Sequence, residues 1–348
     1  MQTRVCRLHG RNDLRIETEH VAAPGEGQVL LAVTDAGICG SDMHYLADGG
    51  IGTIRVREPI ILGHEASGRV LAAGANAGGL AEGDLVAINP SRPCGHCRYC
   101  AEGLAMHCLN MRFNGSAIRL PHEQGLFRDR IVVDAAQCLP LPEGTDAGAA
   151  ACAEPLAVCL HARAMAGDLA GKRVLVTGAG PIGSLCVAAA ADAGAAEIVV
   201  SDLQDTVLSV AREMGATHTI NVARDAAELE SHGADKGHFD VAFECSAASA
   251  AIASAIAVLR PRGTLVQVGV TGSAPMPVNA LVAKEIRVQG THRFHEEFAA
   301  AVAAITSRRI DVRPIITARY PLERAAEAFR VASDRSRSVK VHLSFAGS

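Results

Sequence analysis

Short apolar runs of strand length recur along the chain, and residues typical of turns separate them. In the first part of the chain, residues 29–33 form such a run, and turn signals lie at residues 24–25, 48–50, 78–79 and 82–84. Strands broken by Gly, Pro and Asp at this spacing are typical of compact antiparallel sheets with long loops. We therefore expect a β-rich, barrel-like module up to about residue 134.

The pattern changes near residue 150, where apolar runs alternate with helical segments. The runs cover residues 173–177, 198–202, 239–245, 264–268 and 286–290, and an alanine-rich helix follows the first of them to about residue 193. Strands that alternate with helices predict a parallel, doubly wound sheet. After residue 290, amphipathic helices at 298–307 and 322–332 precede a strand at 340–345. We expect this last part to return to the β-rich module.

Composition narrows the class of protein. The chain has 348 residues, of which 49% are hydrophobic, and this is enough for two domains. A net charge of −4 without a basic run argues against a nucleic-acid or acidic membrane partner. The sequence has no signal pattern and no apolar stretch of spanning length, so we expect a cytoplasmic protein whose cysteines are reduced. Six of the cysteines are expected to be small buried side chains: Cys6, Cys138, Cys152, Cys159, Cys186 and Cys245.

Four closely spaced cysteines are the strongest local signal. Cys94, Cys97, Cys100 and Cys108 follow the pattern C-x2-C-x2-C-x7-C. Thiolates at this spacing converge on one tetrahedral ion, and zinc is the expected metal. An iron–sulfur cluster is an alternative, but its typical bacterial run has a shorter last gap and a proline. A disulfide pair is the other alternative. Because four thiolates leave no open position, we expect a structural zinc site.

A glycine-rich turn predicts a nucleotide site. Gly178, Gly180 and Gly183 follow the run at 173–177 directly, and Asp202 ends the next strand 24 positions after Gly178. This context is that of the dinucleotide fingerprint, in which the glycines permit a tight turn, approach of the pyrophosphate and close packing of the helix on the sheet. Asp202 is expected to bind the ribose hydroxyls and to favour NAD over NADP. A glycine turn in an unrelated α/β protein is the alternative.

Four scattered residues could form a second metal site. Cys39, His64, Glu65 and Glu154 offer one thiolate, one imidazole and two carboxylates. Such a set can bind zinc and leave an open position for chemistry. Spacing alone is only suggestive here, because a single cysteine is more often buried than bound to metal.

Taken together, these motifs resemble the zinc-containing medium-chain dehydrogenases of the polyol (sorbitol dehydrogenase) type. Gly63-His64-Glu65, the four-cysteine lobe, the stretch at 154–158 and the glycine fingerprint occur in that family's order over nearly the whole chain. The resemblance implies an α/β protein with a GroES-like β-rich catalytic domain at 1–148 and 290–348 and a Rossmann NAD-binding domain at 149–289. It also implies two zinc ions per chain, a nicotinamide cofactor, a small-molecule substrate and a homo-oligomer, either a tetramer or a dimer.

The resemblance assigns roles to individual residues. Cys39, His64 and Glu65 match the catalytic zinc ligands, and Glu154 would bind that zinc directly or through water. Ser41 and His44 match the region that moves protons, while Tyr45 and Arg293 match the substrate side. The cofactor would contact Gly178, Gly180, Pro181, Ile182, Gly183, Asp202, Cys245, Val268, Gly269, Val270 and His292.

Within the family, the stretches at 87–91, 111–117, 121–122 and 236–241 resemble a branch that acts on sugar acids. A carboxylate substrate requires a cation, and we expect Arg112 together with His122 to supply the contact. The alternative is that Arg112 only packs or forms an ion pair on the surface of the cysteine lobe. Phe294, which stands where animal sorbitol enzymes have tyrosine, is expected to remove one polar contact and to make sorbitol itself less suitable. The alternatives are a polyol dehydrogenase for sorbitol or xylitol, an NADP-linked dehydrogenase of simple alcohols, and a nucleotide-binding relative without turnover.

Overall fold

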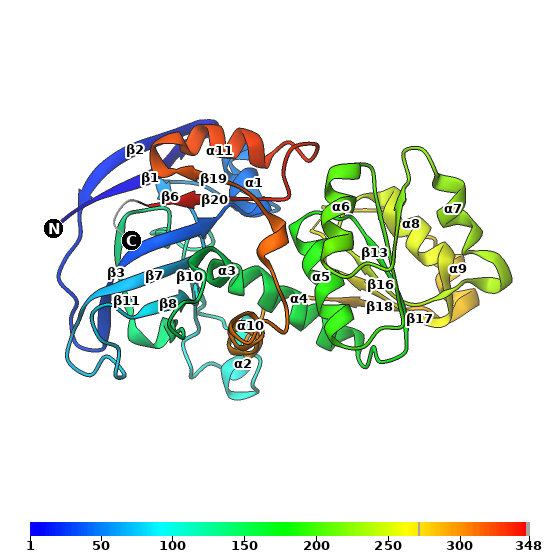
Figure 1. Cartoon of the computed structure of the whole chain (residues 1–348), viewed down its shortest axis with the longest axis horizontal. Coiled ribbons are helices and arrows are strands. Elements are labelled where there is room, and N and C mark those ends of the chain that lie inside the picture. The colour runs from blue at the N-terminus through cyan, green and yellow to red at the C-terminus, as the bar shows by residue number, and fades with distance from the viewer. Residues whose placement is uncertain (271, 346–348) are drawn as a thin grey trace.

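The chain forms two lobes joined side by side (Figure 1). The computed structural model describes residues 1–270 and 272–345, so residues 346–348 of the expected catalytic domain lie outside the described part. The first lobe is rich in strands and carries both ends of the chain, and the second is a sheet covered by helices. Within the described residues, no helix combines the length and apolar character that a membrane crossing would need.

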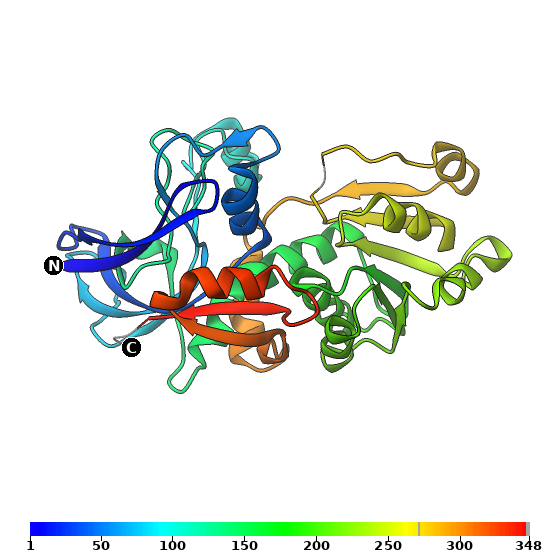
Figure 2. The same ribbon diagram turned by 90° about the horizontal axis from the view of Figure 1, so that it is seen from above.

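The first lobe is built on two sheets. The larger has the order β12-β8-β7-β3-β20-β19, with β11 also paired to β3, and a three-stranded sheet has the order β2-β1-β6. The C-terminal strand β20 runs antiparallel to β3, so the end of the chain returns to this lobe as expected (Figure 2). These strands are β1 Gln2–Gly10, β2 Asp13–His20, β3 Gln28–Gly37, β6 Ile60–Ile61, β7 Glu65–Ala73, β8 Leu85–Ile88, β11 Arg130–Asp134, β12 Cys138–Pro140, β19 Ile316–Pro321 and β20 Lys340–Ser344.

Short pairs and helices complete this lobe. The strand pairs are β4 Gly50–Ile51 with β5 Ile54–Arg55, and β9 Ser91–Arg92 with β10 Arg112–Phe113. The helices are α1 Gly40–Asp48, α2 Arg98–Ala101, α3 Ala147–Ala151, α10 Glu297–Thr306 and α11 Ala325–Ala332. The helix expected from residue 322 begins at Ala325, because Leu322–Arg324 form a tighter 3-10 turn directly after Pro321.

The second lobe is a parallel sheet with the order β15-β14-β13-β16-β17-β18. This is the doubly wound order in which the first strands of the two halves, β13 and β16, lie side by side and a crevice forms at their carboxyl ends. The elements are β13 Arg173–Thr177, α5 Pro181–Asp192, β14 Glu197–Asp202, α6 Asp205–Glu213, β15 His218–Asn221, α7 Ala226–Ser231, β16 Phe239–Glu244, α8 Ser249–Val258, β17 Leu259–Gln267, α9 Val278–Lys284 and β18 Arg287–Gly290. The predicted combination of a β-rich module and a doubly wound sheet is confirmed.

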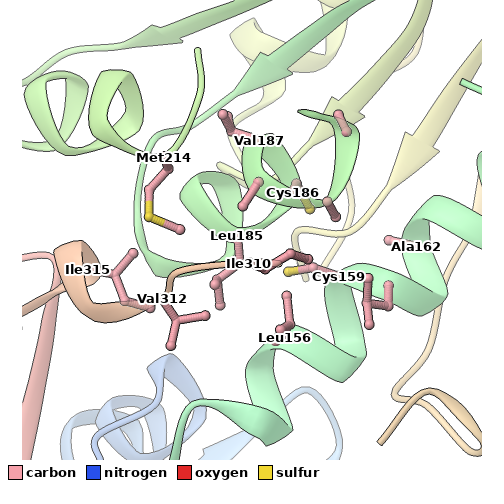
Figure 3. Packing of buried hydrophobic residues seen from close by; sticks show 14 of the residues in the cluster. Leu156, Cys159, Ala162, Leu185, Cys186, Val187, Met214, Ile310, Val312 and Ile315 are labelled. Carbon is pink, nitrogen blue, oxygen red and sulfur yellow. The ribbon is translucent and has the colours of Figure 1, made fainter. Parts of the chain in front are cut away.

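Helix α4, Ala153–Ala166, links the lobes. Its buried face contributes Leu156 and Cys159, which pack with Leu185 of α5 and with Ile310 and Val312 of the returning chain (Figure 3). Small residues on α4 and α5 allow this close approach, and the shared apolar cluster fixes the first turn of α4 relative to the parallel sheet.

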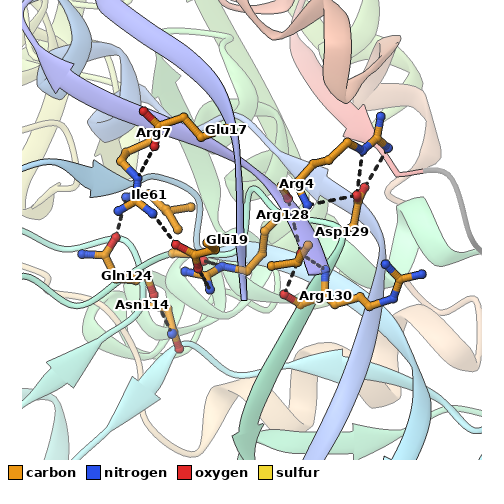
Figure 4. A network of polar contacts seen from close by, with 12 residues as sticks. Arg4, Arg7, Glu17, Glu19, Ile61, Asn114, Gln124, Arg128, Asp129 and Arg130 are labelled. Carbon is orange, nitrogen blue, oxygen red and sulfur yellow. Dashed lines mark hydrogen bonds and ion pairs between the residues drawn. The ribbon is translucent and has the colours of Figure 1, made fainter. Parts of the chain in front are cut away.

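Ion pairs hold the first hairpin to the rest of its lobe. Arg4 in β1 binds both carboxylate oxygens of Asp129, and Arg128 donates to Glu19 of β2 at 3.0 Å (Figure 4). Arg7 donates to Glu17 and Glu19 across the β1–β2 pair. The hairpin alone would bury little apolar surface, so these contacts add to its attachment.

Candidate active site

Cys39 stands where β3 ends and α1 begins. Its backbone N–H donates to Asp42 Oδ2 at 3.0 Å, which satisfies a free donor at the start of α1. The other oxygen of Asp42 accepts from Gly63 N at 3.2 Å. Asp42 is fully buried, and it therefore fixes the chain segments that carry Cys39 and His64 relative to each other.

His64 and Glu65 lie at the beginning of β7, beside Cys39. One ligand atom from each of Cys39, His64 and Glu65 falls within 4.8 Å of the others. His64 Nδ1 is 3.7 Å from Asp42 Oδ1, and the hydroxyl of Ser41 is 3.5 Å from His64 Nε2. The structure thus brings together three residues that are separated by up to 26 positions in the sequence.

Lys340 is a member of this cluster that the sequence did not reveal. It begins β20, and its Nζ donates to Glu65 Oε1 at 2.8 Å and Oε2 at 2.6 Å, with both side chains buried. Burial would raise the pKa of Glu65, but the Lys340 ammonium and the nearby His64 together outweigh this effect and hold the pKa below its usual value. Gly37 of β3 leaves room for this pair, since a Cβ there would lie 2.2 Å from Glu65 Oε2.

Glu154, in the first turn of α4, faces the same cavity as Cys39. Burial raises the pKa of Glu154 to about 8. Desolvation and the nearby Glu65 carboxylate raise the pKa of Cys39 to about 11. Without a cation both groups therefore favour their neutral forms, and a divalent cation such as zinc would stabilise the deprotonated thiolate and carboxylates, so the donor set suits such an ion.

The glycine fingerprint has the geometry expected from its sequence. Gly178 has a φ of +86°, which only glycine adopts readily, and a Cβ on Gly183 would lie 1.8 Å from the Gly178 carbonyl oxygen. Asp202 ends β14, and its Oδ2 accepts from Ala179 N at 2.7 Å. The carboxylate therefore braces the turn whose following helix, α5, presents its free N–H groups to a phosphate.

One cavity of about 350 Å³ joins these two groups of residues across the lobes. Its lining includes Cys39, Ser41, His44, His64, Glu65, Glu154, Gly180, Pro181, Ile182, Gly183, Cys245, Val268, Gly269 and Val270. Gly178 and Asp202 line a neighbouring cavity with Ser201 and Ser246. Cys245, expected as a buried thiol, is half-buried at the cavity wall, whereas the other five cysteines without a metal role are buried.

Arg335 is a second residue that sequence reasoning missed. It lies on the loop between α11 and β20 and lines the cavity beside the fingerprint. Its Nη1 stands 2.9 Å from the place where a Cβ on Gly180 would lie. A guanidinium beside the N-terminus of α5 is a suitable partner for a phosphate group. No motif marks this position, because the loop is far from the fingerprint in sequence.

Of the residues expected to move protons or contact substrate, His44 lines the cavity, whereas Tyr45 and Arg293 are not part of its lining. His44 contacts Asp48 at 3.0 Å, while the Tyr45 hydroxyl is buried and accepts from Ala117 N at 3.2 Å. The guanidinium of Arg293 lies 4.0 Å above the Phe113 ring, which in turn stands 5.6 Å from the His64 ring. Arg293 is therefore close to the metal-ligand cluster.

Two residues expected in or near the site have other neighbours. His292 stacks on His107, with ring centroids 5.6 Å apart, and lies outside the lining of both cavities. Phe294 is buried and packs on Phe298, so its ring belongs to the apolar core.

Arg112 and His122 are not brought to the cavity that contains Cys39 and Glu154. Arg112 is exposed and already donates to Glu123 at 2.7 Å. His122 is buried, and its Nε2 accepts from Arg57 N while its Nδ1 donates to Arg119 O. With both ring nitrogens used, His122 has the contacts of a core histidine, and the alternative of surface pairing fits Arg112 better.

The four-cysteine lobe is a separate site. The sulfur atoms of Cys94, Cys97, Cys100 and Cys108 lie within 4.8 Å of one another. Cys97 Sγ is 3.6 Å from that of Cys100 and 3.9 Å from that of Cys108, close to the ~3.8 Å edge of a tetrahedral zinc–thiolate site. All eleven cysteines are free thiols, so the disulfide alternative is wrong. Backbone N–H groups of Cys94 and Asn110 point at Cys108 Sγ.

Comparison with known proteins agrees with this geometry. Residues 25–143 match the alcohol dehydrogenase GroES-like domain, and residues 181–307 match the zinc-binding dehydrogenase family. The chain is 41% identical to L-idonate 5-dehydrogenase (NAD(P)(+)) of Escherichia coli (strain K12) over 346 residues, which cover 99% of both chains. It is 36% identical to sorbitol dehydrogenase of Gallus gallus over 346 residues, which cover 97% of this chain and 94% of the relative.

Solved structures agree as well. The crystal structure of L-idonate 5-dehydrogenase from Escherichia coli superposes with a TM-score of 0.95 and covers 99% of both chains. That of 2R,3R-butanediol dehydrogenase from Bacillus subtilis superposes with a TM-score of 0.87 at 28% identity, over 98% of this chain and 99% of that one. Since both halves of the chain and its full length match, this protein belongs to the zinc-binding dehydrogenases and is an enzyme of that family.

Proposed function

We propose that this enzyme interconverts L-idonate and 5-keto-D-gluconate with a nicotinamide cofactor. The observation that carries the proposal is the single cavity that joins Cys39, His64, Glu65 and Glu154 to the glycine fingerprint. The choice of substrate is supported by the 41% identity to the Escherichia coli idonate enzyme over the full chain. The 36% identity to a sorbitol dehydrogenase supports a second candidate, the oxidation of polyols such as sorbitol or xylitol.

We propose definite residues for the metal ions and the cofactor. Cys39, His64 and Glu65 would hold the catalytic zinc, with Glu154 as a direct ligand or through water, and Cys94, Cys97, Cys100 and Cys108 would hold the structural zinc. When bound, the catalytic zinc supplies a Lewis acid for the reacting oxygen, and the nicotinamide ring exchanges hydride with the reacting carbon. The carboxylate of Asp202 favours NAD, because it would repel a 2′-phosphate.

Two residues of α1 provide a path for the proton. Ser41 and His44 are three positions apart, so they share one face of the helix, and both line the cavity. Ser41 would take the hydroxyl proton of the substrate and pass it through His44 toward solvent. His44 Nδ1 is engaged with Asp48, which leaves Nε2 free to exchange the proton.

We further propose that Arg293 recognises the carboxylate of the sugar acid. Within the described residues its guanidinium has no recorded hydrogen bond or ion pair. It stacks on the ring of Phe113, which in turn contacts the His64 ring. Arg112, the residue first expected in this role, already has a carboxylate partner in Glu123. The geometry therefore favours Arg293 over Arg112.

A spectrophotometric panel tests the reaction. NADH and NADPH are followed with idonate, 5-ketogluconate, sorbitol and xylitol, and we expect turnover of the idonate pair, with preference for NAD. Robust oxidation of sorbitol without reduction of 5-ketogluconate would refute the idonate assignment. Cys39→Ser serves as the inactive control.

A variant pair tests carboxylate recognition. Arg293→Ala should lower kcat/KM for idonate by about 10- to 100-fold more than for a neutral polyol, since it removes a charge-assisted contact worth ~1.5–3 kcal/mol. Arg112→Ala is the matched control, and it should not lower kcat/KM for idonate more than kcat/KM for the neutral polyol. If only Arg112→Ala lost idonate turnover, the carboxylate contact would lie there instead.

A further inference from the structure

A third cluster of metal-ligand side chains lies on the nucleotide-binding lobe. Glu197 begins β14, His238 directly precedes β16, and His232 caps the C-terminal end of α7. Strands β14 and β16 both flank β13 and run parallel to it, so their first residues meet at one edge of the sheet. The glycine fingerprint follows the carboxyl end of β13, at the opposite edge. This cluster is therefore remote from the cofactor cavity.

The three side chains are already in ligand geometry. One ligand atom from each of Glu197, His232 and His238 lies within 4.8 Å of the other two. His238 Nε2 is 2.6 Å from Glu197 Oε2, and the rings of His232 and His238 meet edge to face with centroids 5.2 Å apart. Phe239 packs against both imidazoles, at 5.1 Å from His232 and 5.0 Å from His238. The aromatic contact limits the rotation of both rings.

The hydrogen bonds around the cluster leave donor atoms for a metal. His232 Nδ1 donates to the Glu228 carbonyl at 3.0 Å, so its Nε2 retains a lone pair. A ligating histidine commonly makes this second contact to a carbonyl, because it fixes the tautomer and the orientation of the ring. Within the described residues, the Glu197 carboxylate is paired with His238 and with no arginine or lysine. No such side chain would therefore compete with a metal ion for this carboxylate.

Arg173 is the one cation recorded next to the cluster in the described part of the chain. Its Nη1 donates to His238 Nδ1 at 3.2 Å, and its Nε lies 3.7 Å from Asp240 Oδ2. The neutral His238 therefore carries its proton on Nε2 and donates it to Glu197. When Nε2 binds a metal, the proton moves to Nδ1 and Arg173 turns to Asp240. The half-exposed Arg173 side chain leaves room for this change.

We propose that Glu197, His232 and His238 form a binding site for a divalent transition-metal ion, with zinc as the best match. Two imidazoles and one carboxylate are a recognised zinc set, and the half-buried edge leaves the fourth position to water. The ion would connect the end of α7 to the starts of β14 and β16. This third zinc is distinct from the two that the family uses, and it stabilises the nucleotide-binding lobe without taking part in the chemistry.

Metal counting on the intact enzyme tests the site. Wild-type enzyme, His232→Ala, His238→Ala and the control His218→Ala are equilibrated in the same buffered zinc solution, and zinc per chain is measured by plasma mass spectrometry. His218 is an exposed histidine of the same lobe that pairs with Glu228. We expect three zinc ions per chain in the wild type and in His218→Ala, and two in the other variants. Two ions in the wild type, or an equal loss in His218→Ala, would overturn the proposal.

Thermal unfolding gives a second, independent measurement. Added zinc should raise the Tm of the wild type and of His218→Ala beyond the rise seen in His232→Ala, because an ion that binds only the folded state stabilises it. His232→Ala should keep wild-type turnover, which shows that it is folded and that the site is remote from the reaction. An identical zinc-dependent rise in all variants would refute a third site.

Discussion

Replacing Lys340 by methionine is the sharpest test of how the active site is held. Lys340 and Glu65 expose 2% and 1% of their side chains, and the ammonium reaches both carboxylate oxygens at 2.8 and 2.6 Å. Methionine keeps the length of the side chain but removes the charge. Glu65 would then remain buried beside the Cys39 thiol without a counter-ion in the zinc-free protein.

The size of the effect follows from burial. Removing one partner of a buried ion pair costs ~3–5 kcal/mol, because the other charge stays desolvated. At ~2–4 °C per kcal/mol for a domain of this size, the Tm of the zinc-free protein should fall by about 10 °C. The double variant Lys340→Met with Glu65→Gln removes both charges and should regain most of this loss. Zinc should also reduce the loss, since the ion compensates Glu65.

Chemical and thermal unfolding of chelator-treated protein measures these values. A loss below ~1 kcal/mol, or a double variant as unstable as Lys340→Met alone, would refute the reasoning. The pH dependence gives a further check. Lys340 holds the pKa of Glu65 below its ordinary 4.5, so the stabilisation is present above pH 4.5 and is lost as the pH falls through the lower folded-state value. The advantage of the wild type over the double variant should therefore shrink in acid.

Four other substitutions test the remaining roles. Cys39→Ser should abolish turnover in a folded protein, whereas Cys97→Ser should first lower the Tm or disturb assembly. A Cys97→Ser enzyme that kept its Tm and assembly but lost all activity would contradict the assignment of a catalytic role to Cys39 and a structural role to Cys97. Arg335→Ala should raise the KM for NAD about tenfold with little change in kcat, as expected for loss of one phosphate contact, and an unchanged KM would exclude that contact. Gly37→Ala should lower activity and Tm together, because the new Cβ would lie 2.2 Å from Glu65 Oε2; wild-type behaviour would show that the strand can move away without cost.

The sequence by itself determined the features that depend on short-range spacing. The cysteine lobe lies within 15 residues, so its pattern alone predicted a tetrahedral site, and the sulfur distances agree with that prediction. The fingerprint could be predicted because the turn at Gly178 and the packing of Gly183 are imposed by neighbouring backbone. The alternation of strands and helices gave the doubly wound sheet for the same reason, since hydrophobic periodicity is a local property.

The tertiary structure decided the contacts that join distant segments. Lys340 and Glu65 are 275 positions apart, and they meet only because β20 pairs with β3 beside the start of β7. Arg335 reaches the fingerprint through the same return of the chain. Conversely, Arg112 stood in a promising stretch of sequence, yet its strand directs it to Glu123. Whether a charged side chain binds substrate or a neighbouring side chain depends on its burial and on the partner that folding brings near. Neither can be predicted from the local spacing of residues in the sequence.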